Sequence, residues 1–339
     1  MSDVQVTTLD QMVGQIAEYG ARPLFNKRMG AKQLGRIVTN RGLHINSLLR
    51  KDEWELLDQR IVGAARTRLR GVQDLMNAGL VTRLGSLGVL TTQWNVASEM
   101  TAADVTMTGR ANGEGDLVDM KLEGRPVPVV FKDFQIGKRY LEAGRLSGNE
   151  LDTTNAEAAA RVVAEKLETM LFSGQSLTFN SDTIYGYTNH PNRNTDTATN
   201  YGGGDWGTIT NIVPTVLGMV TAANNDNYYG PFNLYVANTQ YLQMLETYSD
   251  GSGQSALARV LQLPMIQNVA PSDYLSDGNV VLVQMTRDVV DWAYSQDITL
   301  LEWMSPDGLV GMFKVLAVAT PRVKAEYSGK SGIVHATGA

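Results

Sequence analysis

A long β-rich segment between two amphipathic helices is the feature that most limits the folds open to this chain. Apolar residues recur every three or four positions over residues 52–70 and again over 155–172, and each pattern predicts a helix with one apolar face. Residues 86–108 and 117–136 between them are strand-like, and the Gly, Asn and Asp residues at 111–116 are typical of a hairpin turn. Helices and strands also mix without regular alternation farther along the chain. We therefore predict an α+β fold rather than a doubly wound sheet.

The hairpin formed by the two strand-like stretches is expected to protrude. Pro126 and Pro128 would remove ladder hydrogen bonds from a central strand, so this stretch is predicted at a sheet edge or in an exposed arm. An isolated two-stranded hairpin is marginally stable in water and normally packs against a partner surface. The sequence therefore predicts a hairpin that contacts another surface.

The second helix carries signals for both of its ends. Thr154 followed by Glu157 has the pattern of a capping box, in which each side chain bonds a free backbone amide of the first turn. Gly174 suits the left-handed conformation that ends many helices. Both signals support a helix close to the range given by the apolar pattern.

Residues 21–51 form a basic segment inside an acidic protein. The whole chain of 339 residues has 29 basic and 35 acidic side chains and a formal net charge of −6, whereas this segment contains no Asp or Glu. Its apolar residues are sparse and interrupted by glycines, so it is not expected to fold alone. Two interpretations stay open: a solvated basic tail, or an arm that contacts neighbouring subunits or an enclosed polyanion.

Few residues in the chain suit catalysis or metal binding. The absence of cysteine excludes disulfides, thiolate zinc sites, iron–sulfur clusters and cysteine nucleophiles. Of His44, His190 and His335, His190 is the best candidate for a functional site, because asparagines flank it in the sequence TNHPN. A structural role in a polar turn explains this histidine better than a role as a metal ligand or a base. Glu165 and Glu168 share a helix with basic residues, so surface ion pairing explains them at least as well as acid–base chemistry. We predict no cofactor, no metal and no enzymatic activity.

The composition favours a protein that contacts copies of itself. Charged residues make up 19% of the chain, below the roughly 25% of an ordinary soluble domain. The N-terminal residues lack the pattern of a signal peptide, and no stretch approaches the roughly 20 apolar residues that span a bilayer, so synthesis in a cytosol without membrane contact is expected. Self-association accounts together for the low charge, the protruding hairpin and the basic segment.

Several sequence blocks resemble, in order, the encapsulin branch of the Hong Kong 97-like capsid fold of tailed bacteriophages. They are DEWELLDQRIVGAARTRLRGVQDL at 52–75, GRPVPVVFKDFQIGKRYLEAG at 124–144, LDTTNAEAAARVVAEKLETMLFSGQ at 151–175 with IYGYTNHP at 184–191, and VVDWAYSQDITLLEW at 289–303 with GMFKVLAVATPRVK at 311–324. The third block is similar to the long spine helix of that fold and the turn after it. Together the blocks cover most of residues 50–325.

The resemblance implies a division of the chain into named parts. Residues 1–50 would be the N-terminal arm, 51–84 the first part of the peripheral domain, 85–125 the extended loop, 126–205 the peripheral domain with a spine helix over 154–173, 206–305 the axial domain, and 306–339 the return to the peripheral domain with a C-terminal tail.

The function implied by the resemblance is that of a major capsid protein. Many copies, as hexamers and pentamers, would form an icosahedral shell around viral double-stranded DNA, with portal, scaffolding or decoration proteins as further partners. The location would be the virion, assembled in the host cytoplasm. Encapsulins resemble this chain only from about residue 45 onward, and the basic segment that precedes this point favours a viral shell.

Two alternatives remain beside the capsid protein. The first is an encapsulin-type nanocompartment that packages cargo enzymes, which would be distinguished by the contents of purified particles. The second is a hydrolytic or carbohydrate-active enzyme with an unrecognised site, which would be favoured by a protein that stays monomeric at high concentration.

The site residues of such a protein are subunit contacts. We expect contacts at Phe25 in the arm, at Trp94 and Met100 in the hairpin, and at Tyr228 in an Asn-rich loop. Basic arm residues that face the lumen would neutralise phosphates without reading sequence. These residues are Lys27, Arg28, Lys32, Arg36 and Arg41.

Deletion of residues 1–45 tests the role of the arm. We expect a subunit that folds but fails to close shells, because the arm would hold neighbouring subunits together without forming part of the folded core. Negative-stain microscopy of the purified chain measures this outcome, and normal particles from the shortened chain would contradict it.

Overall fold

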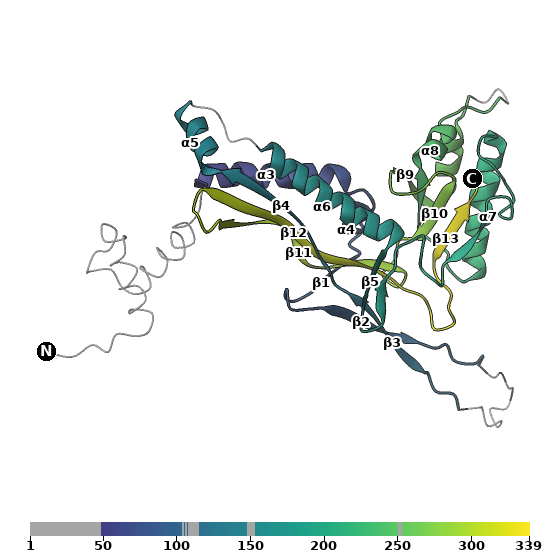
Figure 1. Ribbon diagram of the computed structural model, residues 1–339. Coiled ribbons are helices and arrows are strands. Elements are labelled where there is room, and N and C mark those ends of the chain that lie inside the picture. Colours follow the sequence, from purple (N-terminus) through teal and green to yellow (C-terminus); the bar gives the residue numbers. More distant parts are fainter. Residues whose placement is uncertain (1–48, 104, 106, 108–114, 148–152, 250–252) are drawn as a thin grey trace. The chain divides into compact units, whose positions relative to one another are not determined.

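The computed structural model describes residues 49–103, 105, 107, 115–147, 153–249 and 253–339 (Figure 1). These residues belong to two compact units. The smaller unit contains the chain up to Leu57, Asp133–Asp152 and Leu301–Lys314, and the larger contains Asp58–Lys132, Thr153–Leu300 and Val315–Ala339. Four elements run through both units: helix α3 (Lys51–Arg68) and strands β4 (Val129–Gly137), β11 (Val290–Met304) and β12 (Val310–Val323).

In the smaller unit, an ion pair joins helix α5 (Lys138–Leu146) to the start of α3. The Arg145 guanidinium donates to both carboxylate oxygens of Glu53, at 2.9 and 2.6 Å. The hydrogen bonds from Arg145 hold the pKa of Glu53 below its ordinary value. The rings of Phe134 and Phe313 stack with their centroids 5.1 Å apart. Residues far apart in the sequence thus form one packed unit.

The larger unit contains most of a four-stranded sheet of order β1-β11-β12-β4. Strand β1 (Val81–Arg83) pairs in parallel with β11, with Val81 opposite Trp292. Strand β4 forms one edge of this sheet, and Pro128 lies just before it. Pro126 ends a strand of a separate two-stranded sheet. Pro126 thus lies in an edge strand, as predicted, whereas Pro128 lies outside the strands, just before the edge strand β4.

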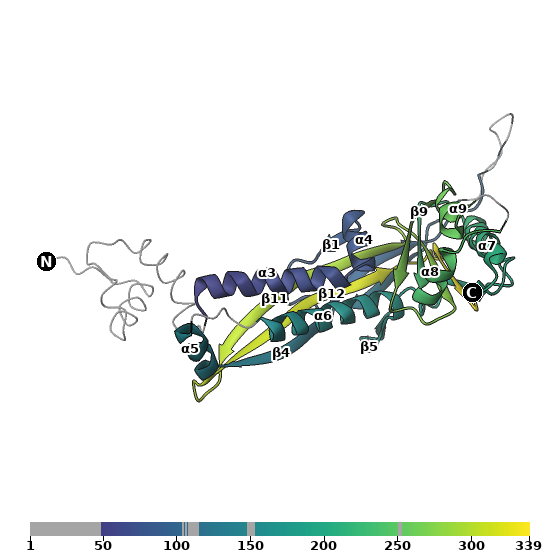
Figure 2. The same ribbon diagram turned by 90° about the horizontal axis from the view of Figure 1, so that it is seen from above.

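The long helix α6 (Thr154–Ser173) lies beside the part of α3 that belongs to the larger unit (Figures 1 and 2). Arg60 and Arg68 of α3 pair with Glu157 and Glu165 of α6, with N–O distances of 3.9 and 3.7 Å. The two pairs are eight residues apart on each helix, so the helices run in the same direction. Beneath these partly exposed pairs, α6 buries a stripe of small and apolar residues, which contributes most of the packing energy.

A five-stranded sheet of order β7-β13-β10-β8-β9 forms the rest of the larger unit. Its strands are β7 (Asn194–Thr197), β8 (Phe232–Ala237), β9 (Ile266–Ser272), β10 (Asn279–Gln284) and β13 (Ile333–Thr337), and the helices near it are α7 (Ile212–Asn225), α8 (Asn238–Met244) and α9 (Ala256–Leu261). Every residue of β8 is buried, because α7 and α8 cover opposite faces of the sheet (Figure 1). Strand β13 joins the chain's last residues to this sheet, between β7 and β10.

The sequence patterns predicted the long helices well and their ends less well. The α+β class is confirmed, and the predicted spine helix has the bounds of α6. Gly174 ends that helix with a positive φ of 68°, as predicted, but its ψ of −166° lies outside the left-handed helical region. The capping box at Thr154 was wrong: the N-cap is Thr153, whose hydroxyl donates to the Glu157 carboxylate at 2.9 Å and caps no backbone amide. The domain boundaries implied by the resemblance stay predictions.

Glycine is required where α7 passes the turn at Tyr201. A Cβ on Gly218 would overlap the Tyr201 carbonyl oxygen and carbon, which are backbone atoms and cannot move aside as a side chain can. By contrast, a Cβ on Gly63 in the middle of α3 would meet nothing within 4 Å. The two positions differ in packing alone, since both lie in helices.

We predict opposite effects of alanine at these two glycines. Gly218→Ala should lower the free energy of unfolding by about 1–3 kcal/mol, because it overpacks a closed contact. Gly63→Ala should raise it by up to about 1 kcal/mol, because alanine favours the helix. Chemical unfolding of the two full-length variants measures both effects. Equal effects of the two substitutions would show that α7 does not pack as closely as described.

Candidate functional site

Strands β2 (Thr91–Ala97) and β3 (Met120–Pro126) form the antiparallel hairpin predicted from the sequence. Their pairing continues toward the tip: Ser98 N–H donates to the Asp119 carbonyl at 2.8 Å, and Thr101 N–H donates to the Asp116 carboxylate at 2.8 Å. Residues 111–114 of the predicted turn lie outside the described residues. Hydrogen bonds between the two sides of the hairpin thus continue past the strands as far as Thr101 and Asp116.

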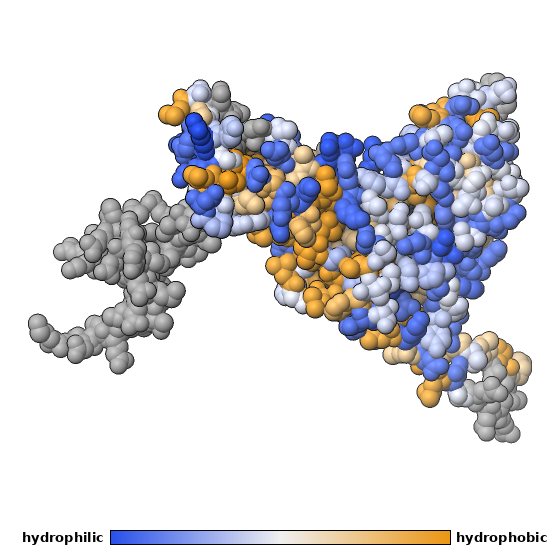
Figure 3. All heavy atoms as spheres, viewed as in Figure 1, coloured by the Kyte–Doolittle hydropathy of each residue, from blue (hydrophilic) through white to orange (hydrophobic). Residues whose placement is uncertain are grey.

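Apolar side chains of the hairpin are exposed to solvent. Val105 is 96% exposed, Met107 is fully exposed and Leu117 is 87% exposed. Met100, Met120 and Leu122 are exposed as well. Figure 3 shows hydrophobic groups along this part of the surface. Several large apolar side chains exposed on one hairpin are suited to a contact with another molecule.

The base of the hairpin is held by a tryptophan between two arginines. The guanidinium carbon of Arg125 lies 5.1 Å from the ring centroid of Trp94, and that of Arg322 lies 5.8 Å from it. Arg125 also lies 4.9 Å from the ring of Tyr185. Burial lowers the pKa of Arg125, and the nearby Glu123 carboxylate opposes this shift. These cation–π contacts join β2 and β3 to β12, so they fix the direction in which the hairpin leaves the subunit.

A buried carboxylate completes this anchor. Asp291 is fully buried on β11, pairs with the Arg322 guanidinium, and lies 3.6 Å from the Lys324 ammonium. Arg322 also donates to the hydroxyls of Thr82 at 2.6 Å and Thr92 at 3.1 Å. The Thr82 hydroxyl in turn donates to Asp291 at 2.7 Å. Strands β1, β2, β11 and β12 thus contribute to one hydrogen-bonded charge network, which we call the Asp291 network.

A surface recess of about 370 Å³ opens beside the hairpin base. It is lined by residues 94–97 of β2, Tyr228, Asp288 and residues 324–326. The lining mixes apolar groups with the charged side chains of Asp288, Lys324 and Glu326.

The structure separates the predicted contact residues into three groups. Met100 is exposed in the hairpin, and Trp94 is half-buried in the anchor just described. Tyr228 is only 5% exposed, whereas Tyr229 beside it is 64% exposed, so the tyrosine available to another molecule is Tyr229. The remaining residues lie outside the described part of the chain: Phe25, Lys27, Arg28, Lys32, Arg36 and Arg41. A role of any of these residues in subunit contact or DNA binding stays a prediction.

His190 is a buried structural residue. Burial and the nearby Arg125 and Arg193 cations lower its pKa to about 3, so the ring is neutral at ordinary pH. Its Nδ1 accepts the Asn192 N–H at 3.2 Å within a turn. His335 is also neutral, because burial and Arg193 lower its pKa to about 4.

Among the described residues, no three acidic or histidine side chains gather as a metal site would need. None of the described helices is both long and apolar enough to cross a bilayer.

Sequence reasoning missed the role of Glu168 and was correct for Glu165. Glu165 pairs at the surface with Arg161 and Arg68, each at 3.7 Å. Glu168 is only 1% exposed, and its carboxylate accepts hydrogen bonds from two backbone amides of another helix. The signal was present in the sequence, because Glu168 follows Ala164 by four residues and precedes Leu171 by three on the buried stripe of the helix.

The sequence of this chain is similar to those of a family of unknown function and of encapsulin shell proteins. A family model described as a family of unknown function (DUF6260) matches residues 44–336. The chain is 24% identical over 281 residues to the type 1 encapsulin shell protein EncA of Myxococcus xanthus. The aligned region covers 83% of this chain and 92% of that protein.

Solved structures of low sequence identity share the fold. The virus-like particle from Pyrococcus furiosus matches with a TM-score of 0.60 and 18% identity, over 84% of this chain and 98% of that one. The capsid of Myoviridae phage XM1 matches with a TM-score of 0.58 and 16% identity, over 79% of this chain and 92% of that one. The Hong Kong 97-like fold predicted from the sequence is thereby confirmed.

We predict that the Asp291 network is necessary for stability. Arg322→Met should lower the free energy of unfolding by about 3–5 kcal/mol, because it leaves a buried carboxylate without its main partner. The double variant Arg322→Met with Asp291→Leu should recover part of this loss, because no buried charge remains unpaired. Chemical unfolding of the full chain measures both.

The matched control for this prediction is Glu55→Gln. It removes the exposed Lys51–Glu55 pair and should change stability little. If Arg322→Met were as mild as Glu55→Gln, the network would not be the anchor of the hairpin.

Proposed function

The chain belongs to the family of unknown function DUF6260, and we propose that it is a major capsid protein whose copies form an icosahedral shell around viral double-stranded DNA. One observation carries the assembly part of this proposal: an ordered hairpin that exposes Val105, Met107 and Leu117 and is held rigidly at its base. A surface of this kind is suited to lie on a neighbouring copy. The fold, which is that of shell-forming proteins, supports the same conclusion.

The energies favour assembly through several contacts at once. Burial of the six exposed apolar side chains of the hairpin would contribute on the order of 10 kcal/mol. Association of two subunits costs roughly 4–15 kcal/mol in lost freedom of motion. The hairpin alone therefore roughly offsets this cost, and further surfaces are needed to close a shell. The apolar side chains of Tyr229, Leu242 and Leu245, exposed near the five-stranded sheet, supply one such surface.

The basic segment at residues 21–51 supports DNA as the content. It carries positive charge without any acidic residue, and such a segment neutralises phosphates without sequence preference. Portal, scaffolding or decoration proteins would be further partners, and the location would be the virion, assembled in a host cytoplasm.

An encapsulin-type compartment for cargo enzymes is the second candidate. The relative at 24% identity, an encapsulin shell protein, favours it. The contents of particles purified from the native source distinguish the two candidates. Genome-length DNA inside the particles supports the capsid protein, and a folded enzyme inside them supports the compartment. A protein that stays monomeric at high concentration would contradict both and favour an enzyme.

We predict that charges on the hairpin prevent assembly without unfolding the subunit. The double variant Leu117→Asp with Met120→Asp should remain folded, because both side chains are exposed in the free subunit. It should yield no closed particles, because burying two unpaired carboxylates costs more than the lost apolar contact contributed. Negative-stain microscopy and circular dichroism measure the two outcomes.

The control is Gln93→Glu in the same hairpin. It adds a negative charge at an exposed polar position of β2 without removing an apolar group, so particles should still form. Normal shells from the double variant would show that the hairpin is not an assembly surface.

A further inference from the structure

Helix α4 (Gly71–Asn77) depends on a side chain from another helix for its first turn. Its N-cap, Arg70, makes no side-chain capping bond. Instead the Glu168 carboxylate of α6 accepts the N–H of Gly71 at 2.5 Å and that of Val72 at 3.3 Å. Since the first amides of a helix have no partner within it, Glu168 satisfies donors that would otherwise be buried and unpaired. We call these contacts between α4 and α6 the α4 joint.

The α4 joint is tightly packed. A Cβ on Gly71 would lie 2.9 Å from a Leu171 methyl group and 3.1 Å from Glu168 Oε1, so only glycine allows α4 to approach α6 this closely. The ring of Phe172 lies on the same side, with a carbon 3.2 Å from that Cβ position.

Helix α4 also connects the joint to the five-stranded sheet. The Tyr235 hydroxyl of β8 donates to the Asp74 carboxylate of α4 at 2.9 Å. The Tyr235 ring packs edge to face on Phe172 of α6, with centroids 5.2 Å apart. A change at Glu168 thus acts on a helix that contacts both α6 and the sheet.

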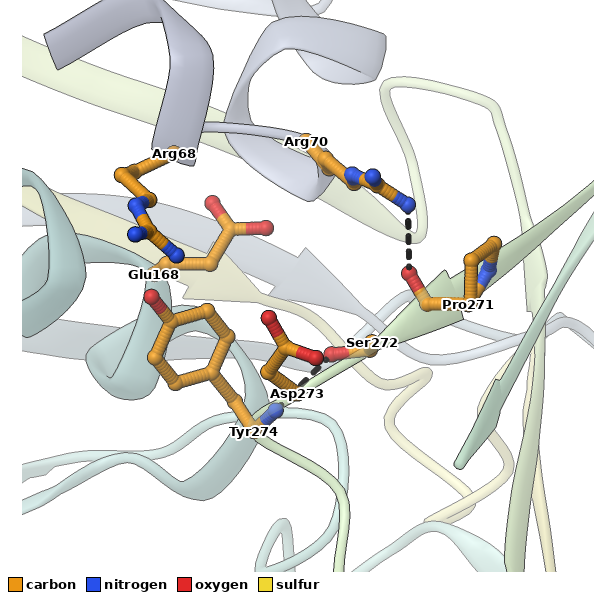
Figure 4. A pocket seen from close by; sticks show the side chains of 7 residues that line it. All are labelled: Arg68, Arg70, Glu168, Pro271, Ser272, Asp273 and Tyr274. Carbon is orange, nitrogen blue, oxygen red and sulfur yellow. Dashed lines mark hydrogen bonds between the residues drawn. The ribbon is translucent and has the colours of Figure 1, made fainter. Parts of the chain in front are cut away.

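A small recess of about 60 Å³ lies on the solvent side of Glu168 (Figure 4). Figure 4 shows the guanidinium groups of Arg68 and Arg70 on either side of the Glu168 carboxylate. The rest of the lining comes from residues 271–274 at the end of β9. The recess is polar and large enough for water, so it offers an ionised carboxylate a hydrated position beside two cations.

We propose that Glu168 is a proton-dependent switch of the α4 joint. The neutral carboxyl group stays buried against α4, and the ionised group moves into the recess toward Arg68 and Arg70, which releases the first turn of α4. The inference concerns the single subunit and does not depend on whether shells form or what they contain.

The charges around Glu168 agree with this assignment. Burial raises its pKa to about 7, and the negative charge of Asp74 adds to this shift, while the backbone hydrogen bonds from Gly71, Val72 and Arg70 oppose it. Burial also raises the pKa of Asp74 itself. The titratable and charged groups that face the joint are Arg68 from α3, Arg70 and Asp74 from α4 and its cap, Glu165 from α6, Tyr187 and Tyr235 from the aromatic cluster, and Asp273 and Tyr274 after β9.

The direction of the effect follows from proton linkage. The pKa of Glu168 is higher in the closed joint than the ordinary value of 4.5 that it has in water, so a bound proton favours the closed joint. This stabilisation is complete below pH 4.5 and is lost as the pH rises through about 7. Between pH 6 and 8.5 the ratio of closed to open joint should fall about tenfold.

Hydrogen exchange of the full-length chain tests the switch. We expect the protection of the amides in residues 71–77, corrected for the intrinsic pH dependence of exchange, to fall about tenfold from pH 6 to 8.5. In Glu168→Gln, which has no titrating group there, protection should be independent of pH over this range. The control Glu165→Gln, one turn away at the surface, should keep the wild-type dependence.

Two results would overturn the proposal. One is wild-type protection that does not change with pH, which decides the matter even if Glu168→Gln fails to fold. The other is a folded Glu168→Gln variant with the same pH dependence as wild type. Particle formation is scored separately by microscopy, so a failure of assembly is not mistaken for a failure of the switch.

Discussion

A two-stranded hairpin cannot bury its own side chains, and this constraint organises the rest of the molecule. The hairpin of β2 and β3 exposes apolar groups from Met120 and Leu122 toward its tip. Its base is fixed where Trp94 lies between Arg125 and Arg322, and Arg322 is held by the buried Asp291. The subunit therefore presents a rigid apolar arm that a second molecule must cover. Self-assembly is the simplest way for a chain to supply that cover.

Buried carboxylates lie at two contacts between elements, the hairpin base and the α4 joint, and their hydrogen-bond and ion-pair partners differ. At the hairpin base, Asp291 has cations as partners and its network is closed. At the α4 joint, Glu168 has only backbone amides as close partners, while the nearest cations lie across a recess. The Asp291 network is stable because each buried charge has a partner of opposite charge. The Glu168 carboxylate has no such close partner, so its protonation state depends on pH. A rigid contact surface and an adjustable joint thus occur in the same unit.

The sequence was sufficient where one local pattern determines the structure. The apolar stripe of α6, the glycine that ends it and the edge position of Pro126 all depend on neighbouring residues, and each was predicted. The missed features depend on contacts between distant segments. Arg125, Asp291 and Arg322 come from three parts of the chain, and nothing local indicates that they meet around Trp94. Glu168 was misjudged because its charge suggested the surface, although its position on the stripe indicated burial.

Self-assembly requires that another copy of this chain cover the hairpin. Cryo-electron microscopy of the purified protein tests this requirement. We expect closed icosahedral particles in which the exposed apolar side chains of each hairpin, Leu117 and Met120 among them, lie against a neighbouring subunit. Monomers that persist at high concentration, or particles in which the hairpin faces solvent, would contradict it.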